Sequence, residues 1–291
     1  MALSILIGGS GLFLSEANLH RQRRAVQGVA PSIAAFTHST YQDVRIRAAD
    51  GPELHAWLFL PVRPHPNYVI TLHGVADTRA GLHKIIQMLL KDGYAVLAPD
   101  SRAHGESEGD TITYGVREAS DVHAWADYLF STQKVANLYG LGESMGAAVL
   151  LQSLAVEPRF EAVAAECSFS SFDAIAHDRI YQAFQTDALP IRALAGPILF
   201  TGLTYTRLRY HIDLDAASPI NAVRHTTIPI LLIHGLRDTN IYPQHSRDLL
   251  MANPQHITPW FVPKAGHTGA FNADPAVFEQ RVTTFFQSHT H

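Results

Sequence analysis

The sequence predicts an α/β fold in which helices flank both faces of a mostly parallel central sheet of about eight strands. Along the 291 residues, short continuous apolar runs alternate with helical patterns, which is typical of parallel strands joined by helices. No internal repeat or low-complexity stretch interrupts this alternation. With 47% hydrophobic and 16% charged residues, the chain is long enough to bury a full core, as one large domain or as a core with an insertion.

The expected strands and helices follow from these runs in chain order. The first two strands form an antiparallel hairpin, because an Asp-Gly-Pro turn at residues 50–52 joins two β-rich segments. The later strands are short apolar runs, and each is separated from the next by a helical pattern. The expected strands are residues 43–47, 53–60, 68–72, 95–98, 135–141, 162–166, 230–234 and 258–262, and the expected helices are residues 82–91, 116–131, 145–156, 244–251 and 275–288.

Residues 169–224 do not fit the alternation. This stretch is rich in alanine and aromatic residues and is broken by prolines at positions 190, 197 and 219. We expect a mainly helical cap here, inserted after the sixth strand. The predicted organisation is an N-terminal apolar, helical segment packing on the core (1–40), a core (41–168 and 225–291) and the cap (169–224).

The N-terminus is apolar from Ala2 to Leu14, and arginines follow at positions 21, 23 and 24. The run is too short to span a bilayer, and it lacks the basic region and cleavage site of a secretory signal. Three glycines at positions 8, 9 and 11 weaken a helix there. We expect the segment to pack on the domain of a cytoplasmic protein; peripheral membrane association is the alternative.

Charge and motif content exclude several classes of function. The net charge of −4 and the absence of a Lys/Arg stripe with interleaved aromatics argue against nucleic-acid binding. The single Cys167 excludes an intramolecular disulfide framework and is expected to be a small buried residue. No metal-binding spacing or phosphate-binding loop occurs, so we expect neither a metal nor a cofactor.

The pentapeptide Gly142-Glu143-Ser144-Met145-Gly146 follows an apolar strand and precedes a helix-compatible run. This G-x-S-x-G pattern in that context predicts a nucleophile elbow, a sharp turn that exposes the serine hydroxyl at the top of the sheet. The N-terminus of the following helix favours negative charge developing near Ser144. Ser144 is therefore the candidate nucleophile.

Two later strand ends supply the other residues that a serine hydrolase needs. Asp238 follows the apolar strand at residues 230–234, and His267 lies in a loop after the last strand. A serine hydroxyl is a poor nucleophile unless an imidazole takes its proton, and a carboxylate holds that imidazole in the required tautomer. His267 is the candidate base and Asp238 the candidate acid.

The oxyanion formed by attack on a carbonyl needs fixed donors. One candidate is the backbone N–H of Met145, the residue after the nucleophile, and the other is the N–H of Val75 in the loop after the third strand. His73, in the same loop, is expected to organise it rather than to act as a second base. In the loop after the fourth strand, Arg102, His104 and Ser107 are expected to be structural.

These motifs together resemble the α/β-hydrolase superfamily. The resemblance rests on Leu72-His73-Gly74, the Asp-Ser-Arg-Ala-His-Gly-Glu-Ser loop at residues 100–107, Gly-Glu-Ser-Met-Gly, His234 to Asp238 and Gly266-His267. Within the superfamily, these loops look like the bacterial serine hydrolases of the Bem46 and serine aminopeptidase-like groups. The resemblance implies the α/β-hydrolase fold, the Ser-Asp-His triad and ester or amide hydrolysis, over roughly residues 43–286.

The sequence departs from the family pattern in two places. The proline that often follows the acid by two residues stands later here, at Pro243, and the oxyanion loop reads His-Gly-Val instead of His-Gly-Gly-Gly. Esters of bulky alcohols are therefore less certain substrates. Aromatic residues of the cap are expected to line an apolar acyl or aryl pocket: Phe169, Phe172, Tyr181, Phe184 and Tyr205, with Phe200 and Tyr210 as further candidates.

Three functions are consistent with the sequence. The leading hypothesis is a serine carboxylesterase acting on small to medium apolar esters. A serine aminopeptidase or amidase is the alternative, in which Asp173, Asp178 or Asp187 of the cap would anchor the substrate amine. A non-catalytic binding protein of the same fold is the third.

Overall fold

The computed structural model describes residues 2–62 and 66–290, and the side chains from Gly8 onward within this range. Met1, the first residue of the predicted N-terminal segment, and His291, the last residue of the predicted core, lie outside the described residues, as do residues 63–65. The described strands form one eight-stranded sheet in the order β1-β2-β4-β3-β5-β6-β7-β8. The antiparallel pairs are β1 with β2 and β2 with β4; from β4 to β8 every neighbouring pair is parallel. The predicted mostly parallel sheet is confirmed.

Each predicted strand and core helix has a counterpart in the structure, with ends that shift by up to three residues. The strands are β1 (Thr40–Arg47), β2 (Glu53–Leu60), β3 (Asn67–Leu72), β4 (Ala95–Pro99), β5 (Asn137–Glu143), β6 (Phe160–Glu166), β7 (Ile230–Gly235) and β8 (Ile257–Val262). The core helices are α2 (Ala30–Thr37), α3 (His83–Lys91), α4 (Glu118–Thr132), α5 (Met145–Ser153), α8 (Pro219–Val223), α9 (Gln244–Ala252), α10 (Ala270–Ala273) and α11 (Pro275–Gln287).

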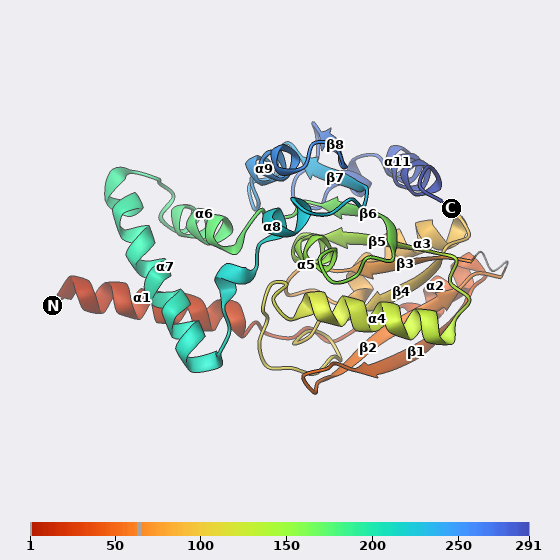
Figure 1. Cartoon of the computed structure of the whole chain (residues 1–291), viewed down its shortest axis with the longest axis horizontal. Helices are drawn as coiled ribbons and strands as arrows, with labels where there is room; N and C mark the ends of the chain where they lie inside the picture. Colours follow the sequence, from red (N-terminus) through yellow and green to blue (C-terminus); the bar gives the residue numbers. More distant parts are fainter. Residues whose placement is uncertain (1, 63–65, 291) are drawn as a thin grey trace.

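Helices cover both faces of the sheet (Figure 1). Alternate residues of each buried strand point to opposite faces, so Leu138 of β5 packs in one apolar cluster and Tyr139 in the other. The first cluster includes α4, α5 and α9, and the second includes α2, α3 and α11. In β3 to β7 both faces are buried, and these strands are largely continuous apolar runs, as the sequence indicated.

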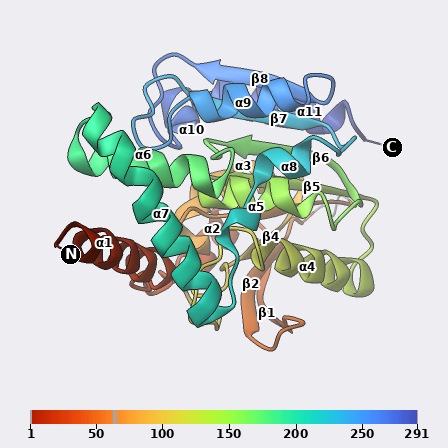
Figure 2. The same ribbon diagram turned by 60° about the vertical axis from the view of Figure 1, so that its left-hand side comes forward.

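The chain between β6 and β7 leaves the sheet as two long helices, α6 (Phe172–Phe184) and α7 (Leu189–Tyr210). They project from the end of the molecule where α1 (Ala2–Leu19) lies, and α1 runs beside α7 in both ribbon views (Figures 1 and 2). Of the N-terminal segment, Leu19 is buried in the core, whereas Gly11 packs on α7. Of the three glycines expected to weaken this helix, Gly11 therefore permits a close helix contact, whereas a Cβ on Gly8 or Gly9 would meet nothing within 4 Å.

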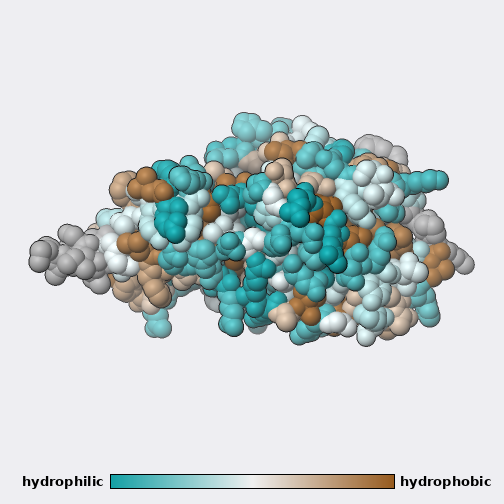
Figure 3. Space-filling view, turned by 90° about the horizontal axis from the view of Figure 1, so that it is seen from below, coloured by the Kyte–Doolittle hydropathy of each residue, from teal (hydrophilic) through white to brown (hydrophobic). Residues whose placement is uncertain are grey.

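Part of the N-terminal apolar run is on the surface. Phe13 of α1 is 72% exposed, and Leu189, Phe200 and Leu208 of α7 are each more than 70% exposed. Apolar atoms are visible at this end of the molecule, on the left of the space-filling view (Figure 3). None of the helices within residues 2–62 and 66–290 has the length and apolar character needed to cross a membrane.

Candidate active site

Ser144 occupies the sharp turn between β5 and α5, with φ 56° and ψ −118°. This backbone conformation is rare for a residue with a side chain and is strained. The two flanking glycines are required by close packing: a Cβ on Gly142 would lie 2.6 Å from Gly146 O, and one on Gly146 would lie 2.2 Å from Leu72 O. The sequence pattern therefore produces a sharp turn of the expected kind, and Ser144 lines a cavity.

The loops after β7 and β8 bring Asp238 and His267 to this turn. His267 Nε2 lies 2.9 Å from Ser144 Oγ, and His267 Nδ1 lies 2.7 Å from Asp238 Oδ2. A carboxylate can only accept, so Nδ1 carries the proton in this pair and leaves Nε2 as the acceptor facing the serine hydroxyl. The three residues that the sequence placed at separate strand ends are thus brought into one hydrogen-bonded chain.

Asp238 is held as an anion. Burial raises the pKa of this carboxyl, but interactions with His234 and His267 outweigh burial and hold the pKa well below its usual range. Its second oxygen, Oδ1, accepts the backbone N–H groups of Asn240 (2.8 Å) and Ile241 (3.0 Å). The carboxylate is therefore fixed in orientation as well as in charge.

Two further acids that the sequence analysis did not single out lie around the elbow. Burial raises the pKa of Glu143 well above its ordinary value, and it raises the pKa of Glu166 to about 7. Glu166, at the end of β6, accepts the N–H of Ser144 through its backbone oxygen (2.8 Å) and the N–H of Ala270 through its side chain (2.9 Å). Near neutral pH, Asp238 is the strongly ionised carboxyl of this group.

The backbone N–H groups of Val75 and Met145 lack acceptors among the described residues. Met145 is the first residue of α5, where helical N–H groups have no partner within the helix. Val75 lines the same cavity as Ser144, and a Cβ on its neighbour Gly74 would lie 3.9 Å from Ser144 Oγ. Both predicted oxyanion donors therefore lie beside Ser144 with their N–H groups available.

His73 and His104 hold the Val75 loop in place. His73 Nε2 accepts the N–H of Ser101 (3.0 Å), and His104 Nε2 accepts the N–H of Ala76 (3.2 Å). Burial lowers the pKa of His73, and it lowers the pKa of His104 to about 4, so both rings stay neutral and can accept. Their contacts are with the loops after β3 and β4, and neither ring lines the cavity.

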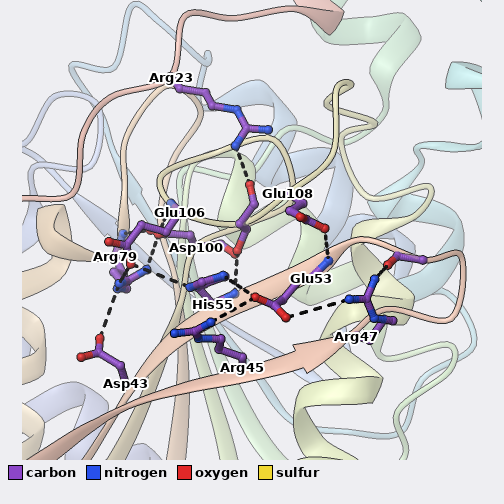
Figure 4. Close-up of polar contacts among 12 residues, drawn as sticks. Arg23, Asp43, Arg45, Arg47, Glu53, His55, Arg79, Asp100, Glu106 and Glu108 are labelled. Atoms are coloured by element: carbon purple, nitrogen blue, oxygen red, sulfur yellow. Dashed lines mark hydrogen bonds and ion pairs between the residues drawn. The ribbon is translucent and has the colours of Figure 1, made fainter.

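A buried ion pair ties the same two loops together (Figure 4). Asp100, after β4, accepts the backbone N–H of Arg79 (2.8 Å) and of Glu106 (2.9 Å), and it pairs with the Arg79 guanidinium. Arg79 also pairs with Glu106, and its Nη2 lies 3.7 Å from Asp43. The Asp100 side chain is fully buried and that of Arg79 is 2% exposed, so this pair anchors the oxyanion loop from behind.

A cavity of about 880 Å³, its open mouth included, leads to Ser144. Of the aromatic residues predicted to line a pocket, Phe169 and Phe172 lie in its wall. Residues that the sequence analysis did not assign to the pocket form the rest: Gly11, Leu14, Ser15, Asn18, Arg21, Tyr114, Ile175, Ala176, Arg179, Ile180, Ile198, Leu199, Gly202, Leu203, Leu214 and Ile241, beside Val75, Ser144 and Met145. The wall is mostly apolar and comes from α1, α6 and α7.

The other predicted pocket aromatics lie elsewhere. Tyr205 donates to Glu16 Oε1 (2.6 Å) and thereby links α7 to α1, and Tyr210 donates to the same oxygen (2.6 Å). Tyr181 packs in a small cluster between α6 and α7, and Phe184 and Phe200 are 54% and 73% exposed. A helix turns its successive side chains to all sides, so aromatic content alone did not identify the inward face.

One cluster of potential metal ligands occurs within residues 2–62 and 66–290. It consists of Cys167, Asp238 and His267. Burial raises the pKa of the Cys167 thiol far above its usual range, so the sulfur stays protonated, and its Sγ accepts the N–H of Thr268 (3.4 Å). Metal ligands are thiolates and free imidazole nitrogens, and here His267 is already bonded on both sides. The donor set does not fit a metal.

The family model described as the alpha/beta hydrolase family matches residues 69–281 of this chain. The chain belongs to the alpha/beta hydrolase family. Among relatives, it is 26% identical to the uncharacterized protein YqkD of Bacillus subtilis over 233 residues, which cover 78% of this chain and 74% of YqkD.

Solved structures of other proteins share the fold of this chain. The esterase Pf2001 of Pyrococcus furiosus aligns with a TM-score of 0.75 and 23% identity, over 94% of this chain and 100% of that one. The acylaminoacyl peptidase of Pyrococcus horikoshii aligns with a TM-score of 0.64 and 16% identity, over 87% of this chain and 42% of that one. At these identities the likeness establishes the fold.

Proposed function

We propose that this alpha/beta hydrolase is a serine carboxylesterase that cleaves small to medium apolar esters through an acyl-enzyme intermediate. The observation that carries the proposal is the chain of contacts from Ser144 Oγ to His267 Nε2 (2.9 Å) and from His267 Nδ1 to Asp238 Oδ2 (2.7 Å) at the end of an apolar cavity. Structural neighbours that are esterases, such as Pf2001, agree with this choice.

In the proposed reaction, Ser144 Oγ attacks the ester carbonyl carbon while His267 Nε2 takes the hydroxyl proton. The carbonyl oxygen becomes an oxyanion and accepts hydrogen bonds from the N–H groups of Val75 and Met145. His267 then gives the proton to the departing alcohol, which leaves the acyl group on Ser144. A water molecule, deprotonated by His267, attacks this acyl-enzyme and releases the acid with Ser144 regenerated.

Asp238 supports this cycle without taking a proton. Its ionised carboxylate stabilises the positive charge that His267 carries after each proton transfer, and it keeps Nδ1 as the protonated nitrogen. The fixed contacts with Asn240 and Ile241 prevent the carboxylate from turning away. His267 therefore returns to the same orientation after every transfer.

The charge of the cavity favours an ester over an aminoacyl amide. An aminopeptidase must hold a substrate ammonium, which requires a carboxylate near the scissile bond. None of the three acids considered for this role lines the cavity: Asp178 pairs with His245 (3.0 Å), Asp187 pairs with Arg192 in an exposed contact, and Asp173 is exposed. The cavity carries arginines instead.

Initial rates on p-nitrophenyl esters from acetate to decanoate test the proposal, with an aminoacyl-p-nitroanilide panel in parallel. We expect ester turnover by the wild type and a loss of at least about a thousandfold in Ser144→Ala. Turnover of the anilides alone would replace the esterase with the peptidase. Silence on both panels, together with no labelling of Ser144 by a fluorophosphonate probe, would indicate a non-catalytic binding protein.

A further inference from the structure

Two arginines line the cavity that leads to Ser144: Arg21, just after α1, and Arg179 in α6. The cavity wall, as drawn from the described residues, contains no other charged side chain. Apolar cavities seldom contain a cation without a counterion, because removing a charge from water is costly unless it is paired. Arg21 is exposed to solvent, whereas Arg179 is partly buried, so the charge of Arg179 in particular needs an explanation beyond packing.

Arg179 is partly buried and bonded only to neutral acceptors. Its Nη1 donates to Gln182 Oε1 (2.7 Å) and to the backbone oxygen of Asn240 (2.8 Å). A guanidinium has five N–H donors, so these contacts leave Nε and Nη2 for another partner. Within residues 2–62 and 66–290, no carboxylate lies at ion-pair distance from it.

The two acids that act electrostatically on Arg179 already accept hydrogen bonds from histidines. Asp178 accepts from His245 Nε2 at 3.0 Å, and Asp238 accepts from His267 Nδ1 at 2.7 Å. Both attract Arg179 electrostatically without pairing with it. Among the residues that the structure describes, no carboxylate therefore serves as a paired counterion of Arg179.

Arg21 and Arg179 also act on each other. Burial lowers the pKa of Arg179, and the positive charge of Arg21 lowers it further. Both arginines also act on Tyr114. Burial raises the pKa of its phenol, whereas Arg21 and, more weakly, Arg179 lower it. Arg21 donates to the side chain of Asn18 (2.7 Å) and also interacts with the Tyr114 hydroxyl. Two like charges at one cavity repel each other, and an anion between them would remove that repulsion.

We propose that Arg179 and Arg21 bind a carboxylate carried by the substrate, so that the preferred ester has an apolar body ending in a free carboxylate. This inference rests on the proposed function, which places the scissile carbonyl at Ser144. Arginine presents a planar fork that pairs with a carboxylate through two parallel hydrogen bonds. The same cavity is lined mostly by apolar side chains, which can contact the body of such a substrate.

Binding of an anionic probe tests the site without any chemistry. We would titrate octanoate and its uncharged amide, octanamide, into the wild type, Arg179→Gln and Arg179→Lys, and follow thermal stability. Octanoate is expected to bind more tightly than octanamide, and Arg179→Gln is expected to weaken octanoate about tenfold or more. Arg179→Lys keeps the charge and should retain part of the preference. Arg192→Gln, which removes an exposed arginine outside the cavity, is the matched control and should behave as the wild type.

Hydrolysis rates separate this inference from the proposed function. The substrates are the p-nitrophenyl monoester of suberic acid and the same compound with its free carboxylate capped as a methyl ester. The ratio of their kcat/KM values should favour the anionic ester in the wild type and fall about tenfold or more in Arg179→Gln. Ser144-dependent turnover with the same ratio in both proteins would overturn the carboxylate site and leave the esterase standing. Octanoate binding that depends on Arg179, without hydrolysis of either ester, would support the carboxylate site and overturn the esterase. If octanoate binds no better than octanamide, the carboxylate site is wrong.

Discussion

Gly11 of α1 lies directly against Gly202 of α7. A Cβ on Gly202 would lie 3.0 Å from Gly11 O and 2.7 Å from Ser15 Oγ, and a Cβ on Gly11 would lie 2.7 Å from Ile198 O. All four residues line the cavity that leads to Ser144. The approach of two helices almost 200 residues apart in the chain therefore sets the position of one cavity wall.

Gly202→Val should separate α1 from α7. Because the added side chain meets backbone atoms on α1, we expect the free energy of unfolding to fall by about 1–3 kcal/mol, the usual cost of overpacking. The displaced wall should also change the ratio of kcat/KM for p-nitrophenyl decanoate to that for acetate. Urea denaturation measures the first effect and initial rates measure the second.

Gly9→Ala is the matched control for Gly202→Val. Gly9 also lies in α1, but a Cβ on it would have no atom within 4 Å. Replacing an exposed helical glycine by alanine should stabilise the protein by up to about 1 kcal/mol. Equal effects of the two variants would contradict the close packing of α1 on α7.

The sheet could be predicted from the sequence because its signal is local. Each strand of the parallel region is a short apolar run, and each connection carries a helical pattern, so the mostly parallel direction of the strands followed without tertiary information. The placement of α1 could not be predicted in the same way. Gly11 lowers the helix propensity of its own segment. Its advantage is the close packing of α1 against Gly202, and no local sequence pattern connects the two positions.

Asp238→Asn should lower kcat by roughly 10⁴-fold and leave the fold intact. Oδ1 of residue 238 accepts two backbone N–H groups, so the amide oxygen of asparagine will keep that position. Its NH₂ group will then face His267 Nδ1 and force this nitrogen to become the acceptor. Nε2 would carry the proton and could no longer take one from Ser144.

Steady-state kinetics and thermal unfolding of Asp238→Asn distinguish a tautomer effect from misfolding. The melting temperature should stay close to that of the wild type while kcat falls, because the backbone contacts of residue 238 are retained. Near-normal turnover would remove Asp238 from the mechanism. A rate loss accompanied by an equal loss of folded protein would assign it a structural role.

The residues at strand ends could be found from the sequence, whereas the cavity wall could not. Ser144, Asp238 and His267 each follow a strand of the parallel region, and the ends of parallel strands meet at one edge of the sheet. Arg179 and Tyr114 have no such signal. They reach the cavity from a helix of the insertion and from a loop before α4, and only the packing of α6, α7 and α1 brings them together.

Asp100→Asn should destabilise the protein and slow the reaction. The substitution removes the buried counterion of Arg79 and leaves it only the exposed carboxylates of Glu106 and Asp43. Removing one partner of a buried pair typically costs about 3–5 kcal/mol. Because the pair anchors the loop that carries Val75, kcat should also fall in the molecules that remain folded. Chemical denaturation and single-turnover rates measure the two effects.

Asp43→Asn provides the control for Asp100→Asn. Asp43 lies 3.7 Å from the same arginine, but its side chain is 63% exposed. An exposed ion pair contributes at most about 1 kcal/mol, so this variant should stay close to the wild type in stability and rate. If the two variants lose similar stability, the buried pair is not what holds the loops together.

His104 should make the stability of the protein depend on pH. Burial lowers its pKa from 6.5 to about 4, so between these values the unfolded chain binds more protons than the folded protein. The stability that His104 contributes is therefore complete above pH 6.5 and is lost as the pH falls towards 4, by up to about 3 kcal/mol.

His104→Gln isolates this contribution, because glutamine can accept the N–H of Ala76 but does not titrate. The difference in free energy of unfolding between wild type and variant should be constant above pH 6.5 and shift in favour of the variant as the pH falls towards 4. Taking the difference cancels other titrating groups, including Glu166, whose raised pKa of about 7 acts in the opposite direction. A difference that stays constant from pH 8 to pH 4 would mean that His104 does not remain neutral in the folded protein.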